Sequence, residues 1–184
     1  MIRIGVAGHR YLADVDRVRA GVRTALQRIA SRHRGEPMTV VSSLAEGADR
    51  LVVEEAIAGF GAGLIVPLPL PCAEYEKDFA SPESRATFTR LLARASEVVP
   101  LPPAPARAEA YAAAGRYVEA ASDVLLAVWD GRPGQGRAGT AEVVAAARRR
   151  GLPLAWVHAG NRRPGTTEPM SLGPEQGTVT FERF

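Results

Sequence analysis

The sequence has little cysteine, few aromatic residues and no long apolar run. The one cysteine, Cys72, excludes an internal disulfide and fits a reducing compartment. No apolar run approaches the roughly 18 residues that span a bilayer, so we expect no membrane helix. The first residues, 1–6, already have the pattern of a β-strand, so we predict no signal peptide. These features together predict a cytoplasmic protein.

Lysine is almost absent as well. Among the 23 basic residues only Lys77 is a lysine, and the formal net charge is only +3. We attribute the arginine content to composition and not to a binding surface, because the basic run Arg148–Arg150 closes a predicted helix and complements its dipole. Aromatic residues make up 6% of the chain, which leaves few rings for stacking bases. The composition therefore argues against nucleic acid as the partner.

Apolar segments alternate with helical ones along the chain. The pattern predicts strands at 2–7, 38–43, 64–67, 97–101, 123–129 and 153–158, and helices at 15–33, 45–60, 81–95, 107–121 and 140–150. Continuous apolar runs such as "VLLAVW" favour a parallel sheet covered on both faces. We therefore predict one α/β, Rossmann-like, three-layer domain over residues 1–159, with a mostly parallel sheet of about six strands. Residues 160–184 form a C-terminal tail, irregular or with an edge strand at "TVTF".

Polar clusters follow three of these strands, where a doubly wound sheet binds its ligands. The first cluster is Gly8-His9-Arg10. Gly8 allows close backbone approach or a positive φ, and Arg10 can bind a phosphate with two parallel hydrogen bonds. The alternative is a tight turn, with a solvated arginine and His9 packed against the chain.

The second cluster contains Ser43, Glu46 and Gly47. Ser43-Leu44-Ala45-Glu46 fits a capping box, in which Glu46 returns a hydrogen bond to the helix start. Gly47 in the first turn of a helix costs about 1 kcal/mol relative to alanine, which favours a ligand close to the backbone. Ser43 and Gly47 are therefore candidate ligand contacts, and Glu46 is either a cap or a catalytic carboxylate.

The third cluster starts at Asp130 and continues through a loop with several glycines, among them Gly131, Gly136 and Gly139. Gly139-Thr140 then opens a helix, whose free amides and positive dipole end suit an anion. Glu142 would repel a phosphate, so it is a ribose or base partner, a catalytic carboxylate, or simply a residue stabilised by the dipole. Asp130 is a ribose partner or a turn former with Gly131. The sequence has no P-loop motif and no metal-ligand cluster, so we predict no metal and no cofactor.

Four stretches together resemble the SLOG superfamily, which includes the lonely-guy (LOG) phosphoribohydrolases and the DNA-processing protein A fold. They are "VAGHR", "SSLAEGADRLVVEEA", "VPLPLPCAEYEKDF" and "SDVLLAVWDGRPGQGRAGTAEVVAAA", and the resemblance covers about residues 1–158. It extends to bacterial SLOG-like proteins with a similar "VWDG…GGTAEVV" ending. The resemblance implies a Rossmann-like fold that binds a nucleotide or a nucleotide-derived ligand at the strand ends, and a homodimer.

One departure from the LOG pattern bears on catalysis. The LOG hydrolases resemble P-G-G-x-G-T-x-x-E, in which the last glutamate is catalytic. Gly139 and Thr140 match its G-T, but the glutamate position is Val143, and Glu142 stands one residue early, about 100° away around the helix. We therefore expect a module that binds or senses a nucleotide or an NAD-derived ligand such as ADP-ribose. The alternatives are an N-glycoside hydrolase of nucleoside monophosphates, with Glu142 or Glu46 as its carboxylate, and a single-stranded DNA binder.

Overall fold

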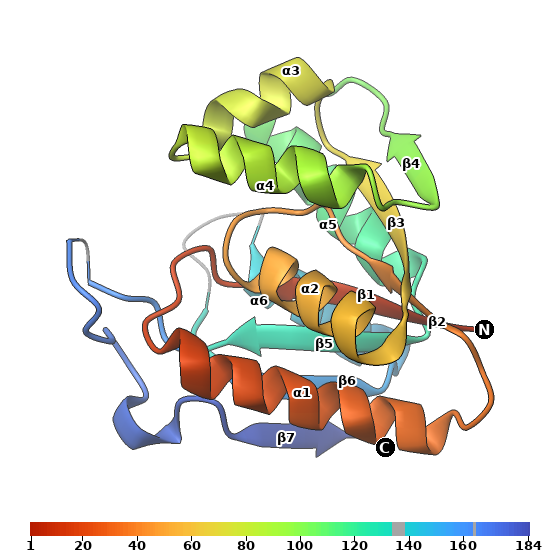
Figure 1. Ribbon diagram of the computed structural model, residues 1–184, viewed down its shortest axis with the longest axis vertical. Helices are drawn as coiled ribbons and strands as arrows, with labels where there is room; N and C mark the ends of the chain where they lie inside the picture. Colours follow the sequence, from red (N-terminus) through yellow and green to blue (C-terminus); the bar gives the residue numbers. More distant parts are fainter. Residues whose placement is uncertain (134–138, 164) are drawn as a thin grey trace.

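The apolar runs of the sequence assemble into one sheet. The computed structural model describes residues 1–133, 139–163 and 165–184 (Figure 1). The strands are β1 (Ile2–Gly8), β2 (Met38–Val41), β3 (Gly63–Leu68), β4 (Glu97–Pro100), β5 (Val124–Trp129), β6 (Leu154–His158) and β7 (Val179–Glu182). Their order is β4-β3-β2-β1-β5-β6-β7. All neighbours are parallel except β6 and β7. The predicted Rossmann-like α/β fold with a mostly parallel sheet is confirmed.

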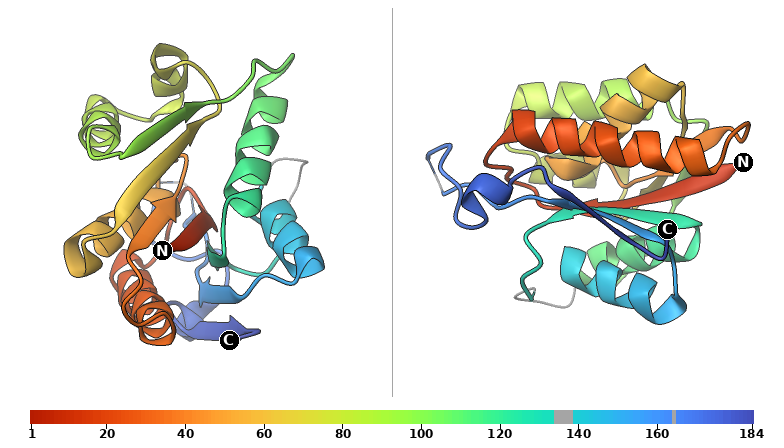
Figure 2. Two further views of the ribbon diagram at one scale, coloured as in Figure 1. Left: turned by 90° about the vertical axis from the view of Figure 1, so that its right-hand side faces the viewer. Right: turned by 90° about the horizontal axis from the view of Figure 1, so that it is seen from below.

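Helices cover both faces of this sheet. They are α1 (Val15–Arg32), α2 (Ala48–Phe60), α3 (Cys72–Tyr75), α4 (Pro82–Leu92), α5 (Arg107–Ala120) and α6 (Thr140–Arg150), with short 3₁₀ turns η1 (Glu76–Asp78) and η2 (Gly173–Glu175). Helices α1, α2 and α4 share one apolar core with one face, while α5 and α6 pack against the other (Figure 2). Every residue of β5 is buried, as a central strand covered on both faces requires.

Local signals in the sequence explain several helix boundaries. The Asp14 side chain accepts a hydrogen bond from the backbone N–H of Arg17, so it caps α1. Ser81 caps α4 in the same way through the N–H of Ser84, with Pro82 at the first helical position. Three helices end earlier than predicted, α1 at Arg32, α4 at Leu92 and α5 at Ala120.

The start of α2 differs from the prediction. The expected capping box does not form, because the helix begins at Ala48 instead of residue 45 and its N-cap, Gly47, makes no side-chain bond. Gly47 has φ +82°, and a Cβ there would lie 2.2 Å from the carbonyl oxygen of Arg10. The close approach to Gly47 is therefore made by the protein's own β1–α1 loop, which presses its carbonyls onto the helix start. The N–H of Ala48 donates to the carbonyl of His9 at 3.0 Å.

The C-terminal segment adds a seventh strand to the sheet. Strand β7 pairs antiparallel with β6, with Ala155 opposite Phe181 and Val157 opposite Val179. Helix α1 also contacts β7, and Gly21 of α1 lies so close to Gly177 that a Cβ would stand 2.3 Å from its carbonyl oxygen. An edge strand therefore forms at the "TVTF" segment and packs beneath α1 (Figure 1).

Replacing Gly47 tests how far the fold depends on this close approach. We expect Gly47→Ala to lower the free energy of unfolding by about 2–4 kcal/mol, because its backbone is strained for any other residue and the added Cβ meets a carbonyl oxygen. The matched control is Gly59→Ala inside α2, where no atom of the described residues lies within 4 Å of the added Cβ. That variant is expected to be neutral or stabilised by about 0.5 kcal/mol. Denaturant unfolding measures both, and an equal effect at the two positions would contradict this reading.

Candidate functional site

The chain changes direction in the middle of the sheet. From β1 it proceeds through β2, β3 and β4 to one edge, and then returns to place β5 on the other side of β1. The carboxyl ends of β1 and β5 lie side by side, with Gly8 opposite Val128. Ligands of doubly wound sheets bind at such a switch point. The loops that follow β1, β2 and β5 all meet at this end of the sheet, on the left of Figure 1.

A cavity of about 310 Å³ opens there between the sheet and helices α5 and α6; we call it the α5/α6 cavity. Its size falls within the range of small-molecule sites. Its polar and glycine lining comes from the ends of β1 and β2, from α2, α3 and α5, and from both ends of α6. These residues are Gly8, Ser43, Asp49, Tyr75, Tyr111, Gly115, Arg116, Gly139, Thr140, Glu142 and Arg149.

A second cavity, of about 490 Å³, lies on the other side of the α6 start; we call it the β5-loop cavity. It is lined by the loops after β1 and β5, by the first residues of α6 and by Asn161, and includes His9, Arg10, Asp130 and Arg132. Gly8, Gly139 and Thr140 line both cavities. The two spaces therefore meet where three of the predicted ligand contacts come together.

The glycines at this junction have different physical roles. A Cβ on Gly8 would lie 2.4 Å from the Cβ of Ala48 and 2.6 Å from the carbonyl oxygen of Val128, so close packing explains that residue. Gly131 has φ +80° and lies against the Trp156 ring. A Cβ on Gly139, the N-cap of α6, would meet no atom of the described residues within 4 Å. Gly139 therefore leaves room for a ligand, whereas Gly8 and Gly131 are constrained by the protein; Gly136 lies outside the described residues.

His9 and Asp130 meet across the two strand ends. The Nε2 atom of His9 lies 3.2 Å from both the backbone nitrogen and Oδ1 of Asp130. The Asp130 carboxylate also accepts hydrogen bonds from the N–H of Arg132 at 3.1 Å and the hydroxyl of Ser171 at 3.0 Å. Burial opposes its ionisation, but these donors and His9 outweigh burial and hold the pKa of Asp130 below its usual value. Asp130 is therefore a fixed, ionised acceptor in the wall of the β5-loop cavity.

Arg10 and Glu46 pair with each other. Arg10 donates from Nε to Glu46 at 2.8 Å, and Glu46 also accepts from the N–H of Ala80 at 2.9 Å and from the hydroxyl of Ser84. Burial is again outweighed by these donors, so the pKa of Glu46 is lowered. Its carboxylate ties the β1–α1 loop to the start of α4, and it does not line the α5/α6 cavity. This geometry favours a structural role for Glu46 over a catalytic one.

Glu142 does line the α5/α6 cavity, despite its shift from the LOG pattern. The glutamate position of that pattern, Val143, also lines this cavity and packs against α5, where a Cβ on Gly115 would lie 2.9 Å from its Cγ2. Arg116 and Arg149 line the same cavity, and neither forms an ion pair with another described residue. One carboxylate, near the α6 start, and two guanidinium groups, of which that of Arg149 lies in the last turn of α6, therefore remain available in this cavity.

Asp49 is a member of this site to which the sequence analysis gave no role. Its side chain is only 7% exposed and accepts a hydrogen bond from the Ser42 hydroxyl at 2.7 Å. Burial raises its pKa to about 6, against the hydrogen bonds from Ser42 and the backbone of Ala45. A signal was available, because Asp49 shares a helical stripe with Val52, Val53 and Ala56, all buried. An acidic residue on such an apolar stripe is expected to be buried, with hydrogen-bond partners inside the protein.

Fold and cavities define an α/β protein with a doubly wound sheet and paired cavities at its switch point. Comparison with models of known protein families gives no match, and comparison with curated protein sequences gives none either. The resemblance to the SLOG superfamily thus stays a prediction from motifs. Among residues 1–133, 139–163 and 165–184, no helix is long and apolar enough to cross a membrane. The same residues hold no group of three or more metal-ligating side chains.

The burial of Asp49 has a measurable pH dependence. In the folded protein the pKa of Asp49 is about 6, above the ordinary 3.8. The contribution of the protonated side chain to the free energy of unfolding is therefore complete below about pH 4 and is lost as the pH rises through 6, because the buried carboxyl group then ionises. Asp49→Asn cannot ionise, so we expect the variant to gain about 1–3 kcal/mol relative to the parent between pH 4 and pH 8. Denaturant unfolding of both proteins at the two pH values measures this gain. A stability difference between the two proteins that does not change with pH would contradict a raised pKa of the buried Asp49 carboxyl group.

Proposed function

We propose that this protein binds a nucleotide-derived ligand with a central phosphate group, of the class of NAD-derived ADP-ribose. The observation that carries the proposal is the junction at Gly8, Gly139 and Thr140, where two cavities share one wall. A molecule with two ribosyl groups joined by a diphosphate has the same arrangement, with a polar anionic centre between two bulky ends.

The junction has the chemistry that a diphosphate needs. Among the described residues, the N–H groups of Thr140 and Ala141 at the start of α6 have no hydrogen-bond partner, whereas the N–H of Glu142 donates to the carbonyl of Gly139. The helix dipole places partial positive charge there. Gly139 leaves open space beside these amides, and Thr140 adds a hydroxyl group. Arg149 and Arg116 supply positive charge on the α5/α6 side. This combination favours an anion at the junction itself.

Each cavity also offers acceptors for sugar hydroxyl groups. Asp130 is held ionised in the β5-loop cavity by its hydrogen bonds, and Glu142 lines the α5/α6 cavity. Tyr111 lines the α5/α6 cavity as well, and its hydroxyl donates to Asp78, which fixes the ring in the wall. A fixed aromatic ring suits a base or another flat group. The motif resemblance to nucleotide-binding SLOG proteins supports the same ligand class.

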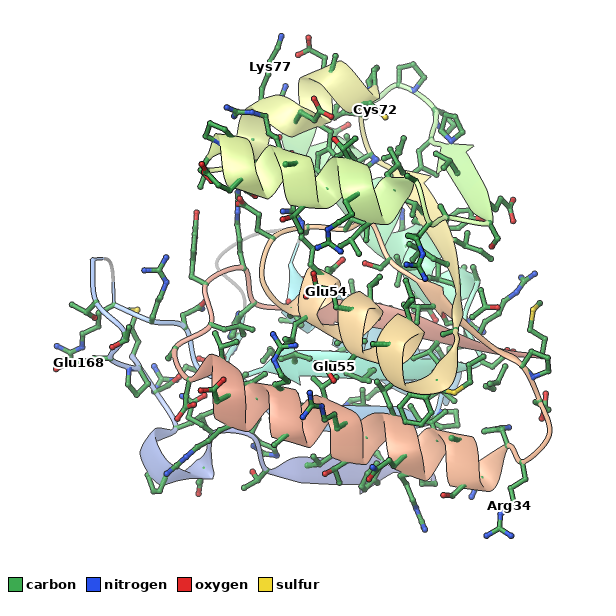
Figure 3. The ribbon with its side chains drawn as sticks, in the orientation of Figure 1. Arg34, Glu54, Glu55, Cys72, Lys77 and Glu168 are labelled. Atoms are coloured by element: carbon green, nitrogen blue, oxygen red, sulfur yellow. The ribbon has the colours of Figure 1, made fainter. Side chains whose placement is uncertain are left out.

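Equilibrium binding distinguishes a two-cavity ligand from a smaller one. By calorimetric titration, we expect ADP-ribose to bind at least tenfold more tightly than AMP, because only ADP-ribose fills both cavities. We expect Arg149→Gln to weaken ADP-ribose binding about tenfold by removing a charged donor. The matched control is Arg34→Gln, which removes the same charge at the other end of the molecule (Figure 3). Equal affinity for the two ligands, or equal loss in both variants, would contradict the proposal.

One observation favours a second candidate function, hydrolysis of an N-glycosidic bond. Asp49 and Glu142 both line the α5/α6 cavity, and the raised pKa of Asp49 suits a proton donor near neutral pH. A carboxylate in that position can stabilise an oxocarbenium-like sugar centre.

Product analysis tests this second candidate. If it is correct, incubation with nucleoside monophosphates and NAD releases free base or nicotinamide, detected by chromatography. Glu142→Gln is then expected to lower the rate at least 100-fold, while Glu168→Gln on the exposed tail (Figure 3) leaves it unchanged. Binding without any release of base over a day would exclude hydrolysis of these substrates and leave the binding function.

A further inference from the structure

A third cavity lies on the opposite side of the β1–α1 loop, between α1, α2 and α4; we call it the arginine cavity. Its volume is about 320 Å³, and its charged lining consists of Arg10, Arg19, Arg50, Arg162 and Glu54. Figure 3 shows Glu54 on α2 beside this region, and its carboxylate pairs with Arg90 of α4 at 2.9 Å. Four guanidinium groups therefore surround a space that contains one carboxylate, already paired.

The positive charge there is only partly balanced by the protein. Arg10 pairs with Glu46, and Arg19 pairs with Glu55, which also holds Arg23. Arg50 and Arg162 form no ion pair with any described residue. Among the described residues, the Arg50 side chain donates only to the carbonyl of Leu44 and to Ser84, and the Arg162 side chain only to the carbonyl of Thr166, at 3.4 Å. Two cations without a carboxylate partner in the described chain thus line one cavity.

Arg50 makes this imbalance costly. Arg50 is only 7% exposed, and its guanidinium carbon lies 4.4 Å from the centroid of the Phe79 ring. Its Nη2 atom has no hydrogen-bond partner among the described residues. Burial lowers the pKa of Arg50, although Glu46 and other nearby negative groups oppose that effect. A buried cation that lacks a counterion is destabilising. An anion in the neighbouring cavity would supply the missing negative charge.

At the opening of the arginine cavity, two guanidinium groups lie beside the same aromatic ring. Tyr11 is half exposed, and the guanidinium carbons of Arg10 and Arg162 each lie 5.6 Å from its ring centroid. Cation–π attraction of this kind holds both guanidinium groups beside the opening. Because the planar guanidinium group can donate two parallel hydrogen bonds to a phosphoryl group, such a pair fits phosphate oxygens.

We infer that the arginine cavity is a second ligand site, which binds a phosphoryl dianion as free phosphate or as a small phosphate monoester. The site is separate from the α5/α6 and β5-loop cavities and does not depend on the function proposed for them. Arg10 lines both the arginine cavity and the β5-loop cavity, so it is the one charged side chain that the two sites share in the described chain. Phosphate in the arginine cavity would compete with Glu46 for that guanidinium group.

Titration of the full chain with sodium phosphate at pH 8 tests this inference, with sodium chloride added to keep the ionic strength constant. We expect saturable shifts in the amide NMR signals of Tyr11, Gly47 and Arg162, with little change at Gly139 and Thr140. Arg162→Gln should weaken binding about tenfold through loss of charged hydrogen bonds. A parallel titration with phenyl phosphate separates the two sources, because tighter binding would identify a monoester and equal binding free phosphate.

The matched control is Arg163→Gln, which removes the same charge from the next residue. Arg163 does not line the arginine cavity, so its substitution should leave the phosphate affinity unchanged. Either of two results would overturn the inference. One is an equal loss of affinity in the two variants, which indicates a general charge effect. The other is a set of shifts centred on Gly139 and Thr140, which places the phosphate at the junction of the other two cavities.

Discussion

Close backbone contact at the end of β1 determines how the rest of this structure is arranged. Gly8 lies against Ala48 and Val128, and Gly47 lies against the carbonyls of His9 and Arg10. A side chain at either glycine would separate the β1–α1 loop from α2 and from β5. Because this loop passes between the cavities, the same contacts fix the α5/α6 and β5-loop cavities on one side and the arginine cavity on the other.

Polar groups near this contact fall into two sets. Arg10, Glu46 and Ser84 satisfy one another and join the loop to α4, so they stabilise the frame. Glu142 and the N–H groups of Thr140 and Ala141 have no such partners among the described residues, and Glu142 and Thr140 line the α5/α6 cavity, as does the unpaired Arg149 further along α6. A preorganised binding site requires polar groups that are free to bind the ligand, held in place by neighbouring groups whose hydrogen bonds are already formed within the protein. The arginine cavity repeats this arrangement, with Arg50 and Arg162 as its uncompensated groups.

The sequence predicted the fold well because strand burial and helix caps are local signals. The continuous "VLLAVW" run forms the buried central strand expected of it, and Asp14 and Ser81-Pro82, which are typical helix-start residues, begin α1 and α4. It failed at Ser43-Leu44-Ala45-Glu46, since the positive φ of Gly47 delays the helix and frees Glu46 for Arg10 and α4. Such pairings join residues far apart in the chain, as does the fold that brings Arg10, Arg50 and Arg162 together around one cavity. The periodicity of the sequence does not reveal such long-range pairings. It does place Asp49 on the apolar stripe of α2.

A crystal structure of the protein soaked with ADP-ribose would test the paired-cavity account most directly. The account predicts the diphosphate at Gly139 and Thr140, with one ribosyl group in each of the two cavities that meet there. Density for the ligand in only one of these cavities, or in the arginine cavity, would contradict it.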